Sequence, residues 1–224
     1  MLWLRRAVQT WADYWYAGWW EFTSLFSRRP PAAWSRGELA PVLLLPGVYE
    51  PWRFLRRAGR RLNAAGHPVH AVLAIRYNVD TIADVAALAQ RYLETHDLNA
   101  VVLVAHSKGG LVGKHMMAVD DTHGRIDRLV AVATPFSGSS MARFMPVRTL
   151  RAFMPTDVTI SSLAANLALN SRITSIFGEF DPHIPGGSRL EGATNIPLPI
   201  VGHFRLLVDE RVLRAIENAA EGKN

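Results

Sequence analysis

The stretch that decides the fold is VVLVAHSKGGLVG, residues 101–113 of the 224-residue chain. It opens with a continuously apolar run, residues 101–105, which is typical of a strand buried on both faces of a parallel sheet. Ser107 follows this run closely, and a glycine-rich helical pattern begins at once. The stretch therefore predicts a serine on a tight turn between a strand and a helix, with its hydroxyl above the edge of the sheet.

Such a turn suits a nucleophilic serine. Gly109 and Gly113 let the following helix pack close to the sheet, and small neighbours relieve crowding around a strained residue. The N-terminus of the helix directs backbone N–H groups and its positive dipole toward an oxyanion that forms on an attacked carbonyl. The alternative interpretation is that Ser107 only caps the helix.

Short aliphatic runs alternate with longer helical patterns on both sides of this stretch. The alternation predicts an α/β fold, in which a mostly parallel central sheet carries helices on both faces. Ligands bind to such sheets beyond the carboxyl ends of the strands. The expected strands are 41–45, 70–75, 100–105, 128–133, 172–177 and 195–201, and the expected helices are 52–65, 81–96, 109–119 and 210–219.

The composition excludes several classes of chemistry. The chain has no cysteine, which rules out disulfide scaffolds, thiolate zinc sites and cysteine nucleophiles. We find no phosphate-binding loop, dinucleotide-binding motif or metal-binding motif, and we expect neither a cofactor nor a metal.

The net charge is +6, and arginines at 53, 56, 57, 60 and 61 form a basic helix face that is either solvated or turned toward a membrane. No nucleic-acid-binding motif is present, so we expect no nucleic acid partner.

Residues 1–40 form a separate N-terminal extension. Six of the seven tryptophans precede residue 40, and large apolar residues recur at helical spacing up to Phe26. Asp13 and Glu21 argue against a transmembrane span, and no clear signal peptide is present. The two open interpretations are an amphipathic helix that makes peripheral membrane contact through residues 1–29, and a helix packed on the protein body or on a second copy. We expect a cytoplasmic protein, with a peripheral location at the inner face of the membrane under the first interpretation.

The motif Ala-His-Ser-x-Gly-Gly at residues 105–110 resembles the nucleophile elbow of small bacterial lipases and esterases of the α/β-hydrolase superfamily. The resemblance covers roughly residues 41–219 and implies an α/β-hydrolase domain over 41–224. The superfamily places its acid and then its histidine after the serine. The resemblance therefore implies a catalytic triad of Ser107, Asp181 and His203.

Each assignment after Ser107 has a rival. Asp181 follows an expected strand and precedes an aliphatic–proline pair, as the superfamily's acid does, but Glu179 lies two residues away. His203 matches the loop before the last helix, whereas His183 lies on the acid's own loop. His106, beside the nucleophile, has the place of a structural support.

The resemblance also implies an oxyanion hole made by the backbone N–H groups of Val48 and Lys108. Residues 137–170 stand where relatives carry a lid, and they form either a short lid-like insertion or a segment packed permanently on the body. We expect the Lys108 side chain at the pocket mouth, where it either favours an anionic acyl group or is solvated. The candidate pocket residues are Tyr49, Phe136, Phe144 and Met145.

These inferences predict a serine-dependent carboxylic ester hydrolase of lipase or esterase character. It would form an acyl-enzyme with an ester or lipid substrate that has an apolar acyl chain. One alternative is an acyltransferase that uses the same triad. The other is a membrane-associated, non-catalytic protein on a hydrolase scaffold.

Overall fold

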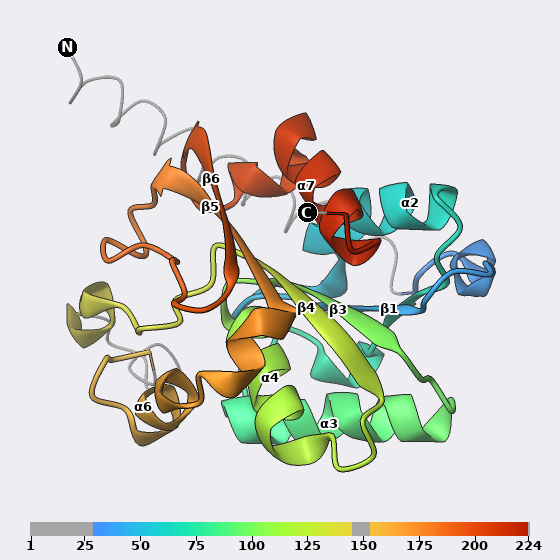
Figure 1. Cartoon of the computed structure of the whole chain (residues 1–224), viewed down its shortest axis with the longest axis horizontal. Helices are drawn as coiled ribbons and strands as arrows, with labels where there is room; N and C mark the ends of the chain where they lie inside the picture. The colour runs from blue at the N-terminus through green and yellow to red at the C-terminus, as the bar shows by residue number, and fades with distance from the viewer. Residues whose placement is uncertain (1–28, 145–152, 224) are drawn as a thin grey trace.

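The computed structural model describes residues 29–144 and 153–223 (Figure 1). The predicted tryptophan-rich helix and its membrane contact fall almost entirely outside the described residues. Trp34, in the 3-10 helix η1 (Ala32–Ser35), is buried and meets the edge of Trp52 at a ring-centroid distance of 5.6 Å. Within 29–144 and 153–223, no helix has both the length and the apolar character that a transmembrane span needs.

A six-stranded parallel sheet forms the centre of the molecule, in the order β2-β1-β3-β4-β5-β6. This sheet confirms the predicted α/β class. The two prolines of the last strand are tolerated because it lies at the edge of the sheet, where a missing N–H donor costs least. The strands are β1 (Val42–Leu45), β2 (Val69–Ala71), β3 (Val101–His106), β4 (Ile126–Val132), β5 (Ile173–Phe180) and β6 (Thr194–Val201).

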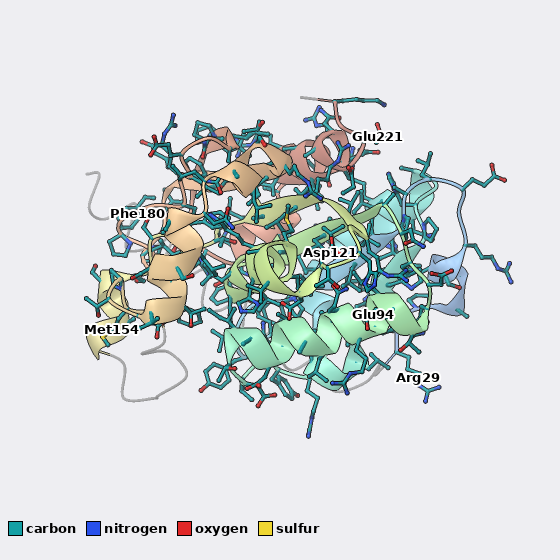
Figure 2. All side chains as sticks on the ribbon, turned by 60° about the horizontal axis from the view of Figure 1, so that its bottom comes forward. Arg29, Glu94, Asp121, Met154, Phe180 and Glu221 are labelled. Atoms are coloured by element: carbon teal, nitrogen blue, oxygen red, sulfur yellow. The ribbon has the colours of Figure 1, made fainter. Side chains whose placement is uncertain are left out.

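Helices cover both faces of the sheet (Figure 1). The helices α2 (Arg56–Ala64) and α7 (Glu210–Ala220) lie on one face, and α3 (Ile82–Thr95) and α4 (Lys108–His115) lie on the other. Figure 2 shows the α3 side, with Glu94 labelled on that helix. Side chains of β3 alternate between the two cores: Leu103 packs in the α3 and α4 core, and Val104 packs in the α2 and α7 core. Burial on both faces explains why β3 reads as an unbroken apolar run.

The basic face of α2 contributes to packing between helices. Arg61 donates hydrogen bonds to Glu217 at 2.5 Å and to Glu210 at 3.0 Å, and both acceptors lie on α7. Arg53, just before α2, is buried. Arg61 therefore joins two helices of one layer, and neither Arg61 nor Arg53 belongs to a continuous solvated surface.

The order of the strands places a binding site beyond β1 and β3. The chain passes from β1 to β2 on one side and then returns to β3 on the other, so the loops that follow β1 and β3 leave toward opposite faces. Parallel sheets bind ligands in the crevice that opens at such a switch point. The loop after β1 and the turn that holds Ser107 both lie there.

Three elements differ from their sequence predictions in the type of secondary structure at one end, beyond small shifts in the bounds of other elements. The expected strand 70–75 ends early, and residues Leu73–Ile75 form the 3-10 helix η3. The expected helix 52–65 begins as the 3-10 helix η2 (Trp52–Leu55). The expected helix 109–119 ends in a π-helical turn, η4 (Met116–Asp120). These differences lie at element ends, where local hydrogen bonding competes with the regular pattern.

The expected insertion 137–170 contains short helices in its described parts. They are the 3-10 helix η5 (Ser140–Phe144), the α-helix α6 (Val158–Ala165) and the start of the 3-10 helix η6 (Ala168–Arg172). Asp157 caps α6, because its carboxylate accepts from the N–H groups of Thr159 and Ile160. After β6, the 3-10 helix η7 (Arg205–Val208) leads into α7.

Gly109 sets how closely α4 approaches β1. A Cβ atom at this position would lie 2.0 Å from the carbonyl oxygen of Leu45, the last residue of β1. We expect Gly109→Ala to push α4 from the sheet and to lower the free energy of unfolding by ~1–3 kcal/mol. Gly186→Ala is the control, because a Cβ there meets nothing within 4 Å. Equal urea midpoints for the two variants would contradict the close packing.

Candidate active site

Ser107 stands in a strained backbone conformation at the turn between β3 and α4. Its φ is 50° and its ψ is −120°, a region that costs a non-glycine residue ~1–3 kcal/mol. Both backbone polar groups of Ser107, its N–H and its carbonyl, make hydrogen bonds that hold the turn. The Ser107 N–H donates to the carbonyl of Val132 at 2.9 Å, and the Thr134 hydroxyl donates to the carbonyl of Ser107 at 3.0 Å. This is the geometry predicted for a nucleophile elbow.

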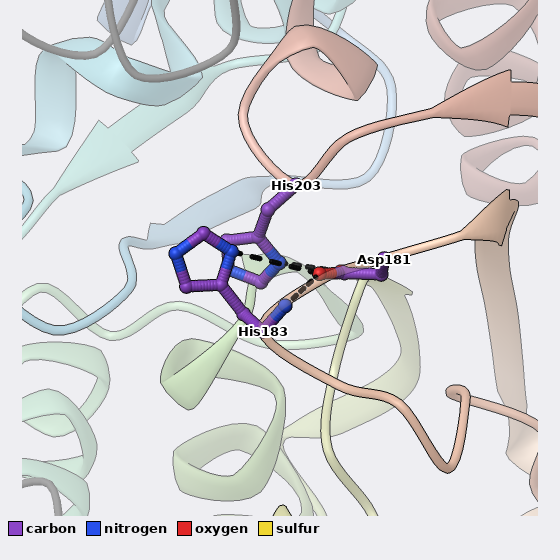
Figure 3. Close-up of side chains that lie close together, drawn as sticks. All are labelled: Asp181, His183 and His203. Carbon is purple, nitrogen blue, oxygen red and sulfur yellow. Dashed lines mark hydrogen bonds and ion pairs between the residues drawn. The ribbon is translucent and has the colours of Figure 1, made fainter. Parts of the chain in front are cut away.

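Asp181 and His203 come from the loops after β5 and β6 and meet in the interior (Figure 3). His203 Nδ1 lies 2.6 Å from Asp181 Oδ2, and both side chains are buried. The rival carboxylate, Glu179, lies within β5 and is exposed. The structure therefore pairs His203 with Asp181.

Burial and charge fix the protonation of this pair. Burial alone would raise the pKa of Asp181, but the charge of His203 and hydrogen bonds from His183 and His203 hold it well below the usual carboxyl range. Burial lowers the pKa of His203 below its ordinary value, although Asp181 opposes this change. At neutral pH the pair is thus a carboxylate and a neutral imidazole, and the imidazole donates its Nδ1 proton to Asp181.

His183 places a second imidazole against Asp181 (Figure 3). Its backbone N–H donates to Asp181 Oδ1 at 2.8 Å, its Nδ1 lies 3.6 Å from the same oxygen, and its ring centroid lies 4.7 Å from that of His203. Ligand atoms of these three residues lie within 4.8 Å of one another, a donor set that Zn²⁺ accepts. The 2.6 Å contact between Asp181 and His203, however, is a hydrogen-bond distance, and that bond already occupies Nδ1 of His203.

The loop after β1 is anchored from two directions. The Asn78 side chain donates to the carbonyl of Pro46 at 2.7 Å, and the Glu50 carboxylate accepts from the Gly47 N–H at 2.8 Å. Within the described ranges, no acceptor is found for the backbone N–H of Val48 or of Lys108. The Val48 amide, in the loop after β1, and the Lys108 amide, at the start of α4, are therefore available to a ligand oxygen.

The Lys108 side chain does not lie where the sequence analysis expected it. It is 2% exposed, and its Nζ donates to the carbonyls of Asn78, at 2.9 Å, and Asp80. Burial lowers its pKa to about 8. Lys108 thus ties the elbow to the loop 76–80, and it neither stands at the pocket mouth nor is solvated.

A pocket of about 140 Å³ opens beside Ser107 and His203. Val48, Glu50 and His183 also reach it. Most of the remaining lining is apolar. It includes Pro135, Met141, Ala142, Phe153, Ile184 and Phe204.

The pocket differs from the predicted one. Tyr49 does not line it, because its positive φ of 61° belongs to a turn that leaves the side chain 39% exposed. Phe136 is buried in the α3 and α4 core, where its ring centroid lies 6.0 Å from Lys114 Nζ. Phe144 ends η5 and Met145 follows it; the side chain of the first and the whole of the second lie outside the described part of the chain.

Sequence reasoning missed Glu50 and most of the apolar lining. Glu50 follows the loop after β1, but only the three-dimensional fold brings its carboxylate to the nucleophile elbow. Phe153 falls in the apolar stretch of the expected lid, which is a signal that could have identified it. Ile184 and Phe204 directly adjoin His183 and His203, so proximity to the predicted triad would have been the available clue.

Comparisons with known proteins agree on the fold. A family model described as the PGAP1-like alpha/beta domain matches residues 60–149, fewer than half of the residues. No curated protein sequence matches the chain.

Solved structures match most of the chain at low identity. A putative non-heme bromoperoxidase from Mycobacterium tuberculosis is 16% identical, with a TM-score of 0.63 over 84% of this chain and 94% of that one. A monoacylglycerol lipase from Paleococcus ferrophilus is 14% identical, with a TM-score of 0.60 over 83% and 96% of the two chains. A mature lipase from Bacillus licheniformis is 13% identical, with a TM-score of 0.58 over 80% and 89%. At these identities the likeness establishes the fold.

The two buried lysines of α4 allow a matched test of this site. Lys108 Nζ has carbonyl partners, whereas Lys114 Nζ, also buried, has no hydrogen-bond partner among the described residues. We expect Lys108→Met to lower the free energy of unfolding by ~1–3 kcal/mol, because two carbonyls lose their donor. Lys114→Met should raise it by a similar ~1–3 kcal/mol, because an unpaired polar group is removed from the interior.

Urea denaturation at pH 7 measures both variants. Loss of stability in both, or gain in both, would contradict the difference in partners.

Proposed function

We propose that this chain, which has the fold of the α/β-hydrolase superfamily, is a serine-dependent carboxylic ester hydrolase that acts through an acyl-enzyme. The observation that carries the proposal is the pairing of buried His203 with Asp181 beside a pocket that His203 and Ser107 both line. A strained serine turn, a neutral imidazole and an oriented carboxylate are the parts that nucleophilic acyl transfer requires.

In the proposed mechanism, Ser107 attacks the ester carbonyl while His203 takes the hydroxyl proton at Nε2. Asp181 holds the Nδ1 proton and thereby fixes the tautomer and orientation of the ring. His203 then gives its proton to the leaving alcohol. Water, activated by the same imidazole, attacks the acyl-enzyme and releases the acid together with free Ser107.

The oxyanion of each tetrahedral intermediate would be bound by the amides of Val48 and Lys108. Both are free of other acceptors in the described ranges, and helix α4 begins at Lys108, so its dipole favours negative charge there. Loss of one such donor typically costs ~10²–10³-fold in turnover. Gly109 allows this arrangement because it keeps α4 close to the end of β1.

The pocket favours an acyl group that is apolar and of modest size. Side chains such as Phe153, Ile184 and Phe204 line the volume next to Ser107, and the Lys108 ammonium group, which is buried against backbone carbonyls, does not face this volume. The two lipases described above support an ester or lipid substrate, although they resemble this chain only in fold.

Ser107→Ala should lower p-nitrophenyl ester hydrolysis by at least ~10³-fold, because the nucleophile of the acyl-enzyme is lost. Ser137→Ala is a matched control, since Ser137 is an exposed serine on the loop after β4. The rate is measured with purified proteins of verified folding. Wild-type rates in Ser107→Ala would refute the proposed nucleophile.

The pH dependence tests the base. His203 acts only when it is neutral, so kcat/KM should rise as pH increases through the pKa of His203. Because burial lowers that pKa, the acid limb should have its midpoint below the ordinary imidazole value of 6.5. A midpoint above this value would show that the base is not buried His203.

A further inference from the structure

A second carboxylate–imidazole pair lies behind the proposed triad. Glu50 and His106 are 2% and 0% exposed, and His106 Nδ1 lies 2.8 Å from Glu50 Oε1 and 2.9 Å from Oε2. The mechanism described above gives neither side chain a chemical step. A buried ionisable pair costs desolvation energy, so its presence beside the site calls for a reason.

The partners of His106 define its protonation state. Nδ1 faces the Glu50 carboxylate, and Nε2 lies 3.2 Å from the carbonyl oxygen of His203. Both partners are acceptors, so both ring nitrogens must carry protons to satisfy them. Burial opposes a charge on His106, but Glu50 outweighs it and raises the pKa of His106 above its ordinary value. His106 is therefore an imidazolium, in contrast to neutral His203.

The pair joins three separate segments of the site. Glu50 also accepts from the Gly47 N–H at 2.8 Å, so the carboxylate holds the loop whose next amide belongs to Val48. His106 immediately precedes Ser107 in the elbow. Through Nε2, His106 donates to the backbone of His203, and the two rings lie 4.7 Å apart.

We propose that Glu50 and His106 are positioning residues that fix three segments relative to one another through one buried ion pair: the loop after β1 (the proposed oxyanion loop), the turn at Ser107, and the loop after β6 that carries His203 (the base loop). This inference rests on the function proposed above and assigns a role within it. Neither residue is proposed to exchange a proton or bond with the substrate.

The pair also affects the base electrostatically. The groups that face His203 are Asp181, His106 and His183, and the charge on His106 opposes a second positive charge on His203. His106 is influenced by three groups: the Glu50 carboxylate, the backbone carbonyl of His203, and the charge of Asp181. An imidazolium at His106 thus helps to keep His203 neutral, the form that accepts the Ser107 proton.

The first test measures the wild-type protein and needs no activity. With histidines labelled by ¹⁵N, the ring nitrogens of His106 should be those of an imidazolium at pH 7, whereas those of His203 should be those of a neutral imidazole at the same pH. His106→Gln assigns the resonances. A neutral His106 ring at pH 7 would overturn the proposal whether or not the protein hydrolyses esters.

The second test is kinetic. Glu50→Gln keeps the size of the side chain but removes the negative charge that holds the Nδ1 proton. Titration with a fluorophosphonate gives the concentration of active sites, and kcat is calculated per active site. For p-nitrophenyl esters this kcat should fall by about 10²-fold with little change in KM, because misplacement of the reacting groups acts mainly on the chemical step. The acid limb of kcat/KM should move to higher pH, because His203 loses a neighbouring cation. Glu38→Gln, at an exposed glutamate, is the matched control.

A merely structural role predicts a different result. Glu50→Gln would then yield fewer active sites, but each remaining site would keep the wild-type kcat and acid limb, and that outcome would overturn the proposal. If wild-type protein hydrolyses no ester and Ser107 takes no label, the proposed function fails instead, and the NMR result still stands on its own.

Discussion

The backbone of Ser107 is held at a φ of 50°, and much of the surrounding structure serves to keep it there. The parallel sheet supplies the Val132 carbonyl that accepts the Ser107 N–H, and the start of the next loop supplies the Thr134 hydroxyl. Gly109 allows α4 to begin against the end of β1. Because each contact comes from a different element, the strain at Ser107 is offset by the fold as a whole.

The two residues that flank Ser107 are both buried basic residues, and each is anchored to a different segment of the chain. His106 is tied to Glu50 and to the backbone carbonyl of His203, and Lys108 is tied to the carbonyls of Asn78 and Asp80. Each anchor reaches the loop after β1, through Gly47 on one side and Pro46 on the other. The proposed nucleophile and the proposed oxyanion loop are thus held as one unit, which is the kind of preorganisation that electrostatic catalysis needs.

Patterns along the chain were sufficient to predict the fold. The motif at residues 105–110 also indicated a resemblance to α/β-hydrolases, and the solved structures confirm this resemblance at the level of fold. The unbroken apolar run of β3 and its glycine-rich helix carry that information locally. The contacts of Lys108 with Asp80 and of Glu50 with His106 were not predictable, because the partners lie 28 and 56 residues apart along the chain and meet only after folding. Tyr49 and Phe136 were misplaced for the same reason: side-chain direction depends on turn geometry and on core packing.

The most direct test of the account is to react the wild-type protein with a fluorophosphonate and to map the modified peptide by mass spectrometry. The account predicts one adduct, on Ser107, that forms faster as pH rises through the titration of His203 and is absent from Ser107→Ala. An adduct on another serine, or none under conditions where the protein is folded, would contradict the central claim that this strained serine is the nucleophile.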